Sequence, residues 1–178
     1  MLKEYFRLRQ DRRVSNAIKA LDLPPGYTIK LTKEGFDGLE TAVIARYDEH
    51  SMCEFPDFLF SPAFMVSVPV QRLFEDLVPE MKFKAVQFLP QDSTRQDWFR
   101  PLYWLTWLSP TDSLHEATSF LGTGLIEHLV LDRDKVGHQH ILHMTLAAEE
   151  VWVLSLTAVE KLLAKRPFGM KFEKVEMR

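Results

Sequence analysis

Two segments of this chain open alike, with Phe64-Met65-Val66-Ser67-Val68-Pro69 in the first and Trp152-Val153-Leu154-Ser155-Leu156-Thr157 in the second. In each segment an apolar run ends near a serine, and an amphipathic stretch follows it. Each then closes on a second short run, Met81-Lys82-Phe83-Lys84-Ala85-Val86 or Met170-Lys171-Phe172-Glu173-Lys174-Val175. The pattern predicts a strand, a helix and a second strand, and it predicts this unit twice.

The amphipathic stretches have the spacing of single-sided helices. The apolar positions are Val70, Leu73, Phe74 and Leu77 in the first stretch and Val159, Leu162 and Leu163 in the second. A serine hydroxyl accepts a hydrogen bond from the free N–H groups at a helix start, so we expect Ser67 and Ser155 to be N-caps, with Thr157 as an alternative in the second segment. Pro79 and Pro167 are expected to end the helices.

Apolar runs elsewhere predict further strands at 102–108, 126–131 and 140–144. Residues 132–135 are expected to form a charged turn, and residues 14–23 a short helix before Pro-Pro-Gly. We therefore predict an α+β fold: a mainly antiparallel sheet with helices on one face, containing two similar strand–helix–strand units.

Length and composition indicate a globular protein. The chain has 178 residues, of which 46% are hydrophobic and 26% charged, and this composition excludes a disordered chain. We expect one domain over residues 1–178, with two lobes, 1–95 and 96–178, as the alternative. The single cysteine, Cys53, excludes an intrachain disulfide and favours the cytoplasm. No signal peptide and no uncharged run of the ~18 residues that a membrane span needs is visible.

Charge is unevenly distributed along the chain. Residues 1–20 carry six basic and two acidic side chains, residues 165–178 carry five and two, and the remainder carries eleven and twenty-one. An acidic body is unsuited to nucleic acid, because phosphates require a clustered basic face. It suits a basic protein partner, since complementary charge speeds association.

The densest acidic stretch, residues 48–57, is called here the acidic segment. One interpretation is a solvated loop whose phenylalanines turn inward, and the other is an exposed surface that binds a partner. On the second interpretation the partner-binding residues are Asp48, Glu49, Glu54, Phe55, Asp57 and Phe58.

Three histidines, His138, His140 and His143, are candidates for a metal site. On a strand the first two share a face and His143 points to the other, and no further metal-binding motif accompanies them. We therefore expect no metal and no cofactor. A small metal-dependent hydrolase that uses these histidines stays an alternative, to be tested by metal analysis.

Several further segments, in their order along the chain, resemble a known family. They are Tyr5-Phe6-Arg7-Leu8-Arg9-Gln10-Asp11, Phe55-Pro56-Asp57-Phe58, Tyr103-Trp104-Leu105-Thr106-Trp107-Leu108-Ser109, Leu129-Val130-Leu131-Asp132-Arg133-Asp134-Lys135-Val136, and Val153-Leu154-Ser155 with Glu160-Lys161 and Phe172-Glu173. In this order they are similar to the bacterial polymorphic-toxin immunity proteins of immunity family eleven, formerly a domain of unknown function. The likeness covers nearly the whole chain. The chain departs from the family at Thr106 and Ser109, where asparagines are usual, and at Pro69, where a glutamate is favoured.

The resemblance implies a function. It implies a cytoplasmic protein that binds and neutralises a cognate toxin domain through a protein–protein complex, without catalysis and without a cofactor. It supplies no set of binding residues, so the acidic segment is the only site prediction. A general protein-binding adaptor with no toxin partner is the other alternative.

Overall fold

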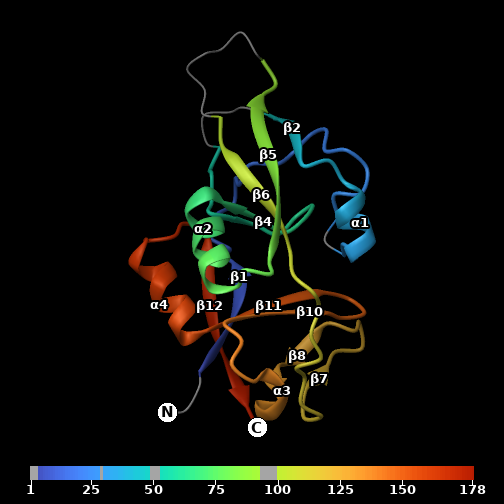
Figure 1. Ribbon diagram of the computed structural model, residues 1–178, viewed down its shortest axis with the longest axis vertical. Helices are drawn as coiled ribbons and strands as arrows, with labels where there is room; N and C mark the ends of the chain where they lie inside the picture. The colour runs from blue at the N-terminus through green and yellow to red at the C-terminus, as the bar shows by residue number, and fades with distance from the viewer. Residues whose placement is uncertain (1–3, 29, 49–52, 93–99) are drawn as a thin grey trace. The chain divides into compact units, whose positions relative to one another are not determined.

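The computed structural model describes residues 4–28, 30–48, 53–92 and 100–178 of the chain (Figure 1). It has an α+β fold in which most strand pairs are antiparallel. The chain divides into two compact units: unit 1 is Met1–Arg9, Ser109–Arg166 and Lys171–Arg178, and unit 2 is Gln10–Leu108 and Pro167–Met170. The alternative from the sequence was two lobes, 1–95 and 96–178. The division in the structure differs from it, because the first residues of the chain belong to the same unit as the last.

Unit 2 contains a five-stranded sheet in the order β2-β5-β6-β4-β3. Its strands are β2 (Ala42–Tyr47), β3 (Phe58–Leu59), β4 (Met65–Ser67), β5 (Lys82–Pro90) and β6 (Leu102–Trp107), and its helices are α1 (Lys33–Gly38) and α2 (Val68–Leu77). β2 runs parallel to β5, whereas β5 and β4 both run antiparallel to β6.

The core of unit 2 lies on one face of this sheet. Alternate residues of β5, such as Val86 and Phe88, are fully buried, as expected for a strand with one face toward the core. Phe36 of α1 packs there with its ring centroid 6.1 Å from that of Trp107. α2 contacts β4 and β6, but its buried residues are not part of this core. Of the two helices, only α1 therefore covers the core face.

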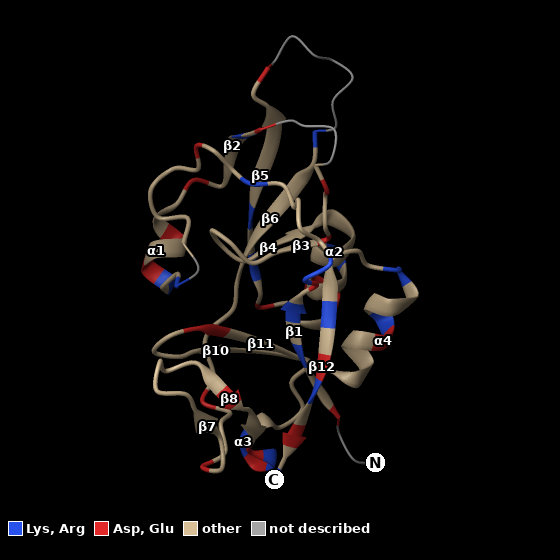
Figure 2. Cartoon of the chain, turned by 180° about the vertical axis from the view of Figure 1, so that it is seen from behind, with Lys and Arg blue, Asp and Glu red and all other residues tan. Residues whose placement is uncertain are grey.

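Unit 1 contains a second five-stranded sheet, in the order β10-β11-β1-β12-β9, and a two-stranded sheet of β7 and β8. The strands are β1 (Tyr5–Gln10), β7 (Ser119–Phe120), β8 (Ile126–His128), β9 (Val130–Leu131), β10 (Ile141–Thr145), β11 (Glu150–Ser155) and β12 (Met170–Met177). The helices are α3 (Arg133–Val136) and α4 (Leu156–Ala164). Acidic and basic residues alternate along β12 (Figure 2).

The core of unit 1 depends on strand β1, which begins the described chain. Tyr5 is buried among residues of β9, β10, β11 and β12, and its hydroxyl donates a hydrogen bond to the carbonyl oxygen of Gln139 at 2.7 Å. On the same strand, buried Arg7 forms an ion pair with Glu149. Residues from the two ends of the chain therefore build one sheet.

The two five-stranded sheets have the same connection at their centres. In unit 2, β4, α2 and β5 follow one another in the chain, and both strands lie next to β6. In unit 1, β11, α4 and β12 follow one another, and both strands lie next to β1. The central strand differs in origin, because β6 follows β5 along the chain whereas β1 comes from the other end.

Two local predictions from the sequence are wrong. Residues 14–23 do not form a helix; they form isolated bridges, Ala17 with Glu54 and Ala20 with Tyr47. Residues 132–135 are not only a turn, because Asp132 caps the short helix α3 by accepting hydrogen bonds from two backbone N–H groups. At residues 14–23, bridges to distant residues replace the expected helix. At residues 132–135, the adjacent cap stabilises a helix where a turn was expected.

Candidate functional site

An open cavity of about 260 Å³ lies in unit 2, beside the first residue of the acidic segment. The lining residues are Ser15, Asn16, Ala17, Lys19, Leu21, Asp48 and Cys53. The cavity therefore combines apolar wall with one acidic and one basic side chain, both of which are exposed. Such a hollow suits a long side chain that has an apolar stem and a charged end.

The wall of the cavity is held by hydrogen bonds between segments far apart in the sequence. The N–H of Ile18 donates to the carbonyl oxygen of Glu54 at 2.8 Å, and the N–H of Glu54 donates to that of Asn16 at 2.9 Å. The N–H of Leu21 donates to the carbonyl oxygen of Arg46 at 2.9 Å. These bonds tie residues 16–21 to the end of β2 on one side and to the acidic segment on the other.

Cys53 lines the cavity, and its surroundings favour the thiol over the thiolate. Burial raises the pKa of Cys53, and the negative charges of Asp48 and Glu54 raise it further. Because the thiolate is the nucleophilic form, a raised pKa opposes nucleophilic chemistry at neutral pH.

Three of the predicted partner-binding residues are exposed or half-buried. Asp48 is exposed and lines the cavity. Glu54 is half-buried, and its Oε2 accepts a hydrogen bond from the N–H of Asn16 at 3.2 Å. Phe55 is half-buried with its ring edge-on to Tyr47, 5.8 Å between centroids. Glu49 lies outside the described residues.

Two other members of the predicted surface have roles inside unit 2. Phe58 is fully buried, with ring centroids 5.1 Å from Phe64, so the prediction that its ring anchors a partner needs correction. It lies on β3, whose pairing with β4 turns the side chain inward. Asp57 accepts hydrogen bonds from the Ser67 hydroxyl at 2.5 Å and from the N–H of Phe168 at 2.7 Å. Both of its carboxylate oxygens are therefore engaged within the unit.

The three histidines have separate surroundings. His138 is exposed, and Nδ1 of His140 lies 2.9 Å from the Ser155 hydroxyl. His143 is buried on β10, where it pairs with Glu150 and stacks on Trp152 with 4.3 Å between ring centroids. Across the described ranges, no three His, Cys, Asp or Glu residues are grouped so that they could hold a metal ion.

The sequence analysis missed the residues that form most of the cavity wall. Residues 15–21 were expected to be helical, so they were not connected with the acidic segment. Ser15 and Asn16 favour turns over a helix interior, and they were the available sign that this stretch is irregular. The pairing with residues 46 and 54 is long-range and has no local signal.

Comparisons with known proteins give no family assignment. No protein-family model matches the chain. No curated protein matches it either. Within the part of the chain that is described, no helix has the length and apolar character needed to cross a membrane.

Proposed function

We propose that this protein is an immunity protein, which binds a cognate bacterial toxin domain and neutralises it by forming a protein–protein complex. It acts in the cytoplasm, by binding and not by catalysis, and it needs no cofactor. The observation that carries the proposal is the open cavity whose rim includes Asp48, at the start of the acidic segment. The family resemblance supplies the partner class, and the cavity supplies the chemistry of contact.

One base, Lys19, and one acid, Asp48, line the cavity, and the charge of Glu54 acts on Cys53 beside them, so the local balance of charge favours a basic partner side chain. Asp48 is exposed, and the half-buried carboxylate of Glu54 lies on the next described stretch of the acidic segment. A lysine or arginine of the toxin would place its aliphatic stem against Ala17 and Leu21 and its charge toward Asp48. A side chain that fills a partner's pocket in this way is the usual form of a binding hot spot.

Similar strand–helix–strand units form part of the same proposal. We infer that β4-α2-β5 and β11-α4-β12 are copies of one unit, each completed by a strand between its two strands. The strand order supports this, since both flanking strands neighbour β6 in one case and β1 in the other. The cavity belongs to unit 2 alone, so the two copies have different surfaces.

The test first looks for a gene beside this one that encodes a toxin domain, and then measures binding of the protein to that domain. Asp48→Lys reverses the charge at the cavity rim, and we expect association with the toxin domain to slow by roughly tenfold at low salt. The effect should shrink as ionic strength rises, because exposed charges are screened. Stopped-flow association rates and survival of cells that express the toxin are the two readouts.

Glu160→Lys is the matched control, because Glu160 is an exposed acid on α4, in the other unit. It makes the same change in net charge and should leave the association rate close to that of the wild type. Equal slowing by both variants would show that only net charge matters, and the cavity assignment would be wrong. A wild-type protein that neither binds nor protects would overturn the immunity function and favour a general adaptor.

A further inference from the structure

A second exposed surface lies on unit 1, at the tip of the β7–β8 hairpin. Phe120, Leu121 and Leu125 are 46%, 46% and 41% exposed, and these three side chains are called here the hairpin tip. They are three of the seven exposed large hydrophobic side chains among the described residues, and they lie within six consecutive positions. Single exposed apolar residues are ordinary, but a cluster of this kind marks an interaction site.

The turn that carries the hairpin tip is closed by its own backbone. The N–H of Leu121 donates to the carbonyl oxygen of Leu125 at 2.8 Å, and the N–H of Gly124 donates to that of Leu121 at 2.8 Å. Gly124 has a φ of +81°, which a side chain at this position would oppose. The tip is therefore presented by a defined turn, so little conformational entropy is lost when it binds.

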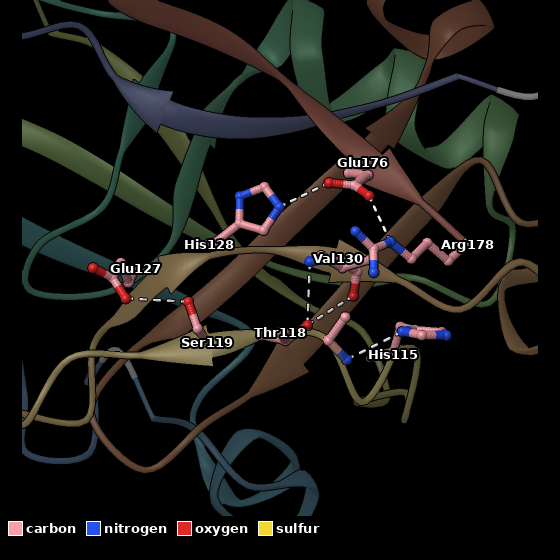
Figure 3. Close-up of polar contacts among 9 residues, drawn as sticks. His115, Thr118, Ser119, Glu127, His128, Val130, Glu176 and Arg178 are labelled. Atoms are coloured by element: carbon pink, nitrogen blue, oxygen red, sulfur yellow. Dashed lines mark hydrogen bonds and ion pairs between the residues drawn. The ribbon is translucent and has the colours of Figure 1, made fainter.

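The base of the hairpin is fixed to the rest of unit 1, as Figure 3 shows. The Thr118 hydroxyl donates to the carbonyl oxygen of Val130 at 2.8 Å and accepts from its N–H at 3.1 Å. Across the hairpin the Ser119 hydroxyl donates to Glu127 at 3.2 Å. His128 of β8 lies 2.8 Å from a carboxylate oxygen of Glu176 on β12. Polar contacts thus hold the base, while the three apolar side chains of the tip stay 41–46% exposed.

The hairpin lies in a stretch of sequence that has acidic but no basic residues. Residues 101–132 contain no lysine or arginine, and they contain the four acids Asp112, Glu116, Glu127 and Asp132. From outside this stretch, Lys135 pairs with Asp112, and Arg178 pairs with Glu176. An apolar tip flanked by carboxylates is complementary to an apolar pocket with a basic rim. The same acids oppose an anionic lipid surface and a second copy of this chain, because both would bring like charges together.

We propose that the hairpin tip is an anchor that inserts into an apolar pocket with a basic rim on the cognate toxin domain. This inference rests on the proposed function and names a contact that is separate from the cavity at Asp48. Removing one large side chain from such an anchor typically weakens binding by about 30-fold or more. Because the three tip residues are not part of the core cluster of unit 1, we expect their substitution to leave that core in place.

The test compares three variants of the full chain in calorimetric titrations with the toxin domain encoded beside its gene. We expect Phe120→Ser and Leu125→Ser each to weaken binding by about 30-fold, mainly through faster dissociation. Leu163→Ser is the matched control, because Leu163 is 54% exposed on α4 of the same unit. It should bind as the wild type does.

The outcomes separate this inference from the proposed function. If the wild type binds and both tip variants bind equally well, the anchor is wrong while the immunity function stands. If the wild type does not bind the toxin domain, the immunity function and the anchor both fail. If the wild type self-associates in sedimentation experiments and the tip variants do not, the tip binds a second copy of this chain and the proposal is overturned. Tip-dependent binding to vesicles that contain phosphatidylglycerol overturns it in favour of a membrane surface.

Discussion

At the scale of single residues, Asp57 holds three segments of unit 2 together. One carboxylate oxygen accepts from the Ser67 hydroxyl and the other from the N–H of Phe168. The backbone adds two further bonds, from the N–H of Asp57 to the carbonyl oxygen of Phe168 and from the N–H of Ser67 to that of Asp57. An acid that reads as a surface charge in the sequence is therefore a structural residue.

Replacement of Asp57 should lower the stability of unit 2. Asp57→Ala removes two charge-assisted hydrogen bonds and leaves two donors without their partner, so we expect a loss of about 2–4 kcal/mol in the free energy of unfolding. Asp57→Asn keeps one acceptor and should lose less. Asp76→Ala, at an exposed position of α2, is the control. Urea unfolding gives the values, and equal stability of Asp57→Ala and the control would contradict the assignment.

Gly169 is required by its backbone and by its neighbour. It has a φ of +81°, and a Cβ at this position would overlap the Pro56 side chain. Gly169→Ala should therefore destabilise the protein by about 1–3 kcal/mol. Gly38 is the contrasting position, because nothing lies within 4 Å of where a Cβ would be added and it ends α1. Gly38→Ala should be neutral or slightly stabilising in thermal unfolding, and a similar loss in both variants would refute the argument.

At the scale of elements, the helix starts show where local sequence is sufficient. Ser155 caps α4 as predicted, accepting a hydrogen bond from the N–H of Ala158 at 3.3 Å. Ser67 occupies the N-cap position of α2, but its hydroxyl makes no capping bond and donates to Asp57 instead. Equivalent serines therefore have different partners, and the partner of Ser67 comes from another element.

Strands β1 and β12 of unit 1 are linked by charged side chains as well as by backbone. Glu173 on β12 lies 2.7 Å from the ammonium of Lys171 and 2.9 Å from the guanidinium of Arg9 on β1. The hydrogen bond from Lys171 lowers the pKa of Glu173, and the charge of Arg9 lowers it further. A carboxylate with a lowered pKa stabilises the fold above its unfolded-state pKa, and this stabilisation is lost as pH falls through the folded-state value.

Glu173→Gln should therefore reduce stability at pH 7 and have no effect in acid. The loss at pH 7 is expected to stay below about 1 kcal/mol, because the group is more than one-third exposed and solvent screens the pair. Urea midpoints at pH 7 and at acid pH measure the difference, with Glu160→Gln as the control on α4. A loss of equal size at both pH values would assign the effect to packing and not to charge.

At the scale of the whole molecule, the order of elements in unit 1 differs from the order in the chain. β1 lies between β11 and β12, although it is separated from both by more than a hundred residues. Unit 2 draws its sheet from one continuous stretch of chain, β2 to β6. The first strand therefore makes long-range contacts on which the sheet of unit 1 depends and the sheet of unit 2 does not.

Deletion of residues 1–9 should expose this dependence. The variant loses the strand between β11 and β12, so hydrogen exchange should accelerate in those strands while β5 and β6 stay protected. In the full chain, Tyr5→Ala should give a milder form of the same pattern. Tyr5→Phe should accelerate exchange less than Tyr5→Ala does, because it loses only the hydrogen bond to Gln139. Equal loss of protection in both units would show that they unfold as one.

The sequence by itself determined the type of several elements. Helical spacing and bounding prolines located α2 and α4, and alternating or continuous apolar runs located β5, β6, β10 and β12, because these signals are local. It also located Asp48 in a dense run of acids. Burial of Phe58 and the engagement of Asp57 were decided only by the tertiary structure, since each depends on pairing between distant segments. The cavity wall from Ser15 to Leu21 and the place of β1 in the sheet of unit 1 likewise depend on pairing between distant segments. Hydrogen bonds between residues far apart in the chain leave no periodic trace in the residues that make them.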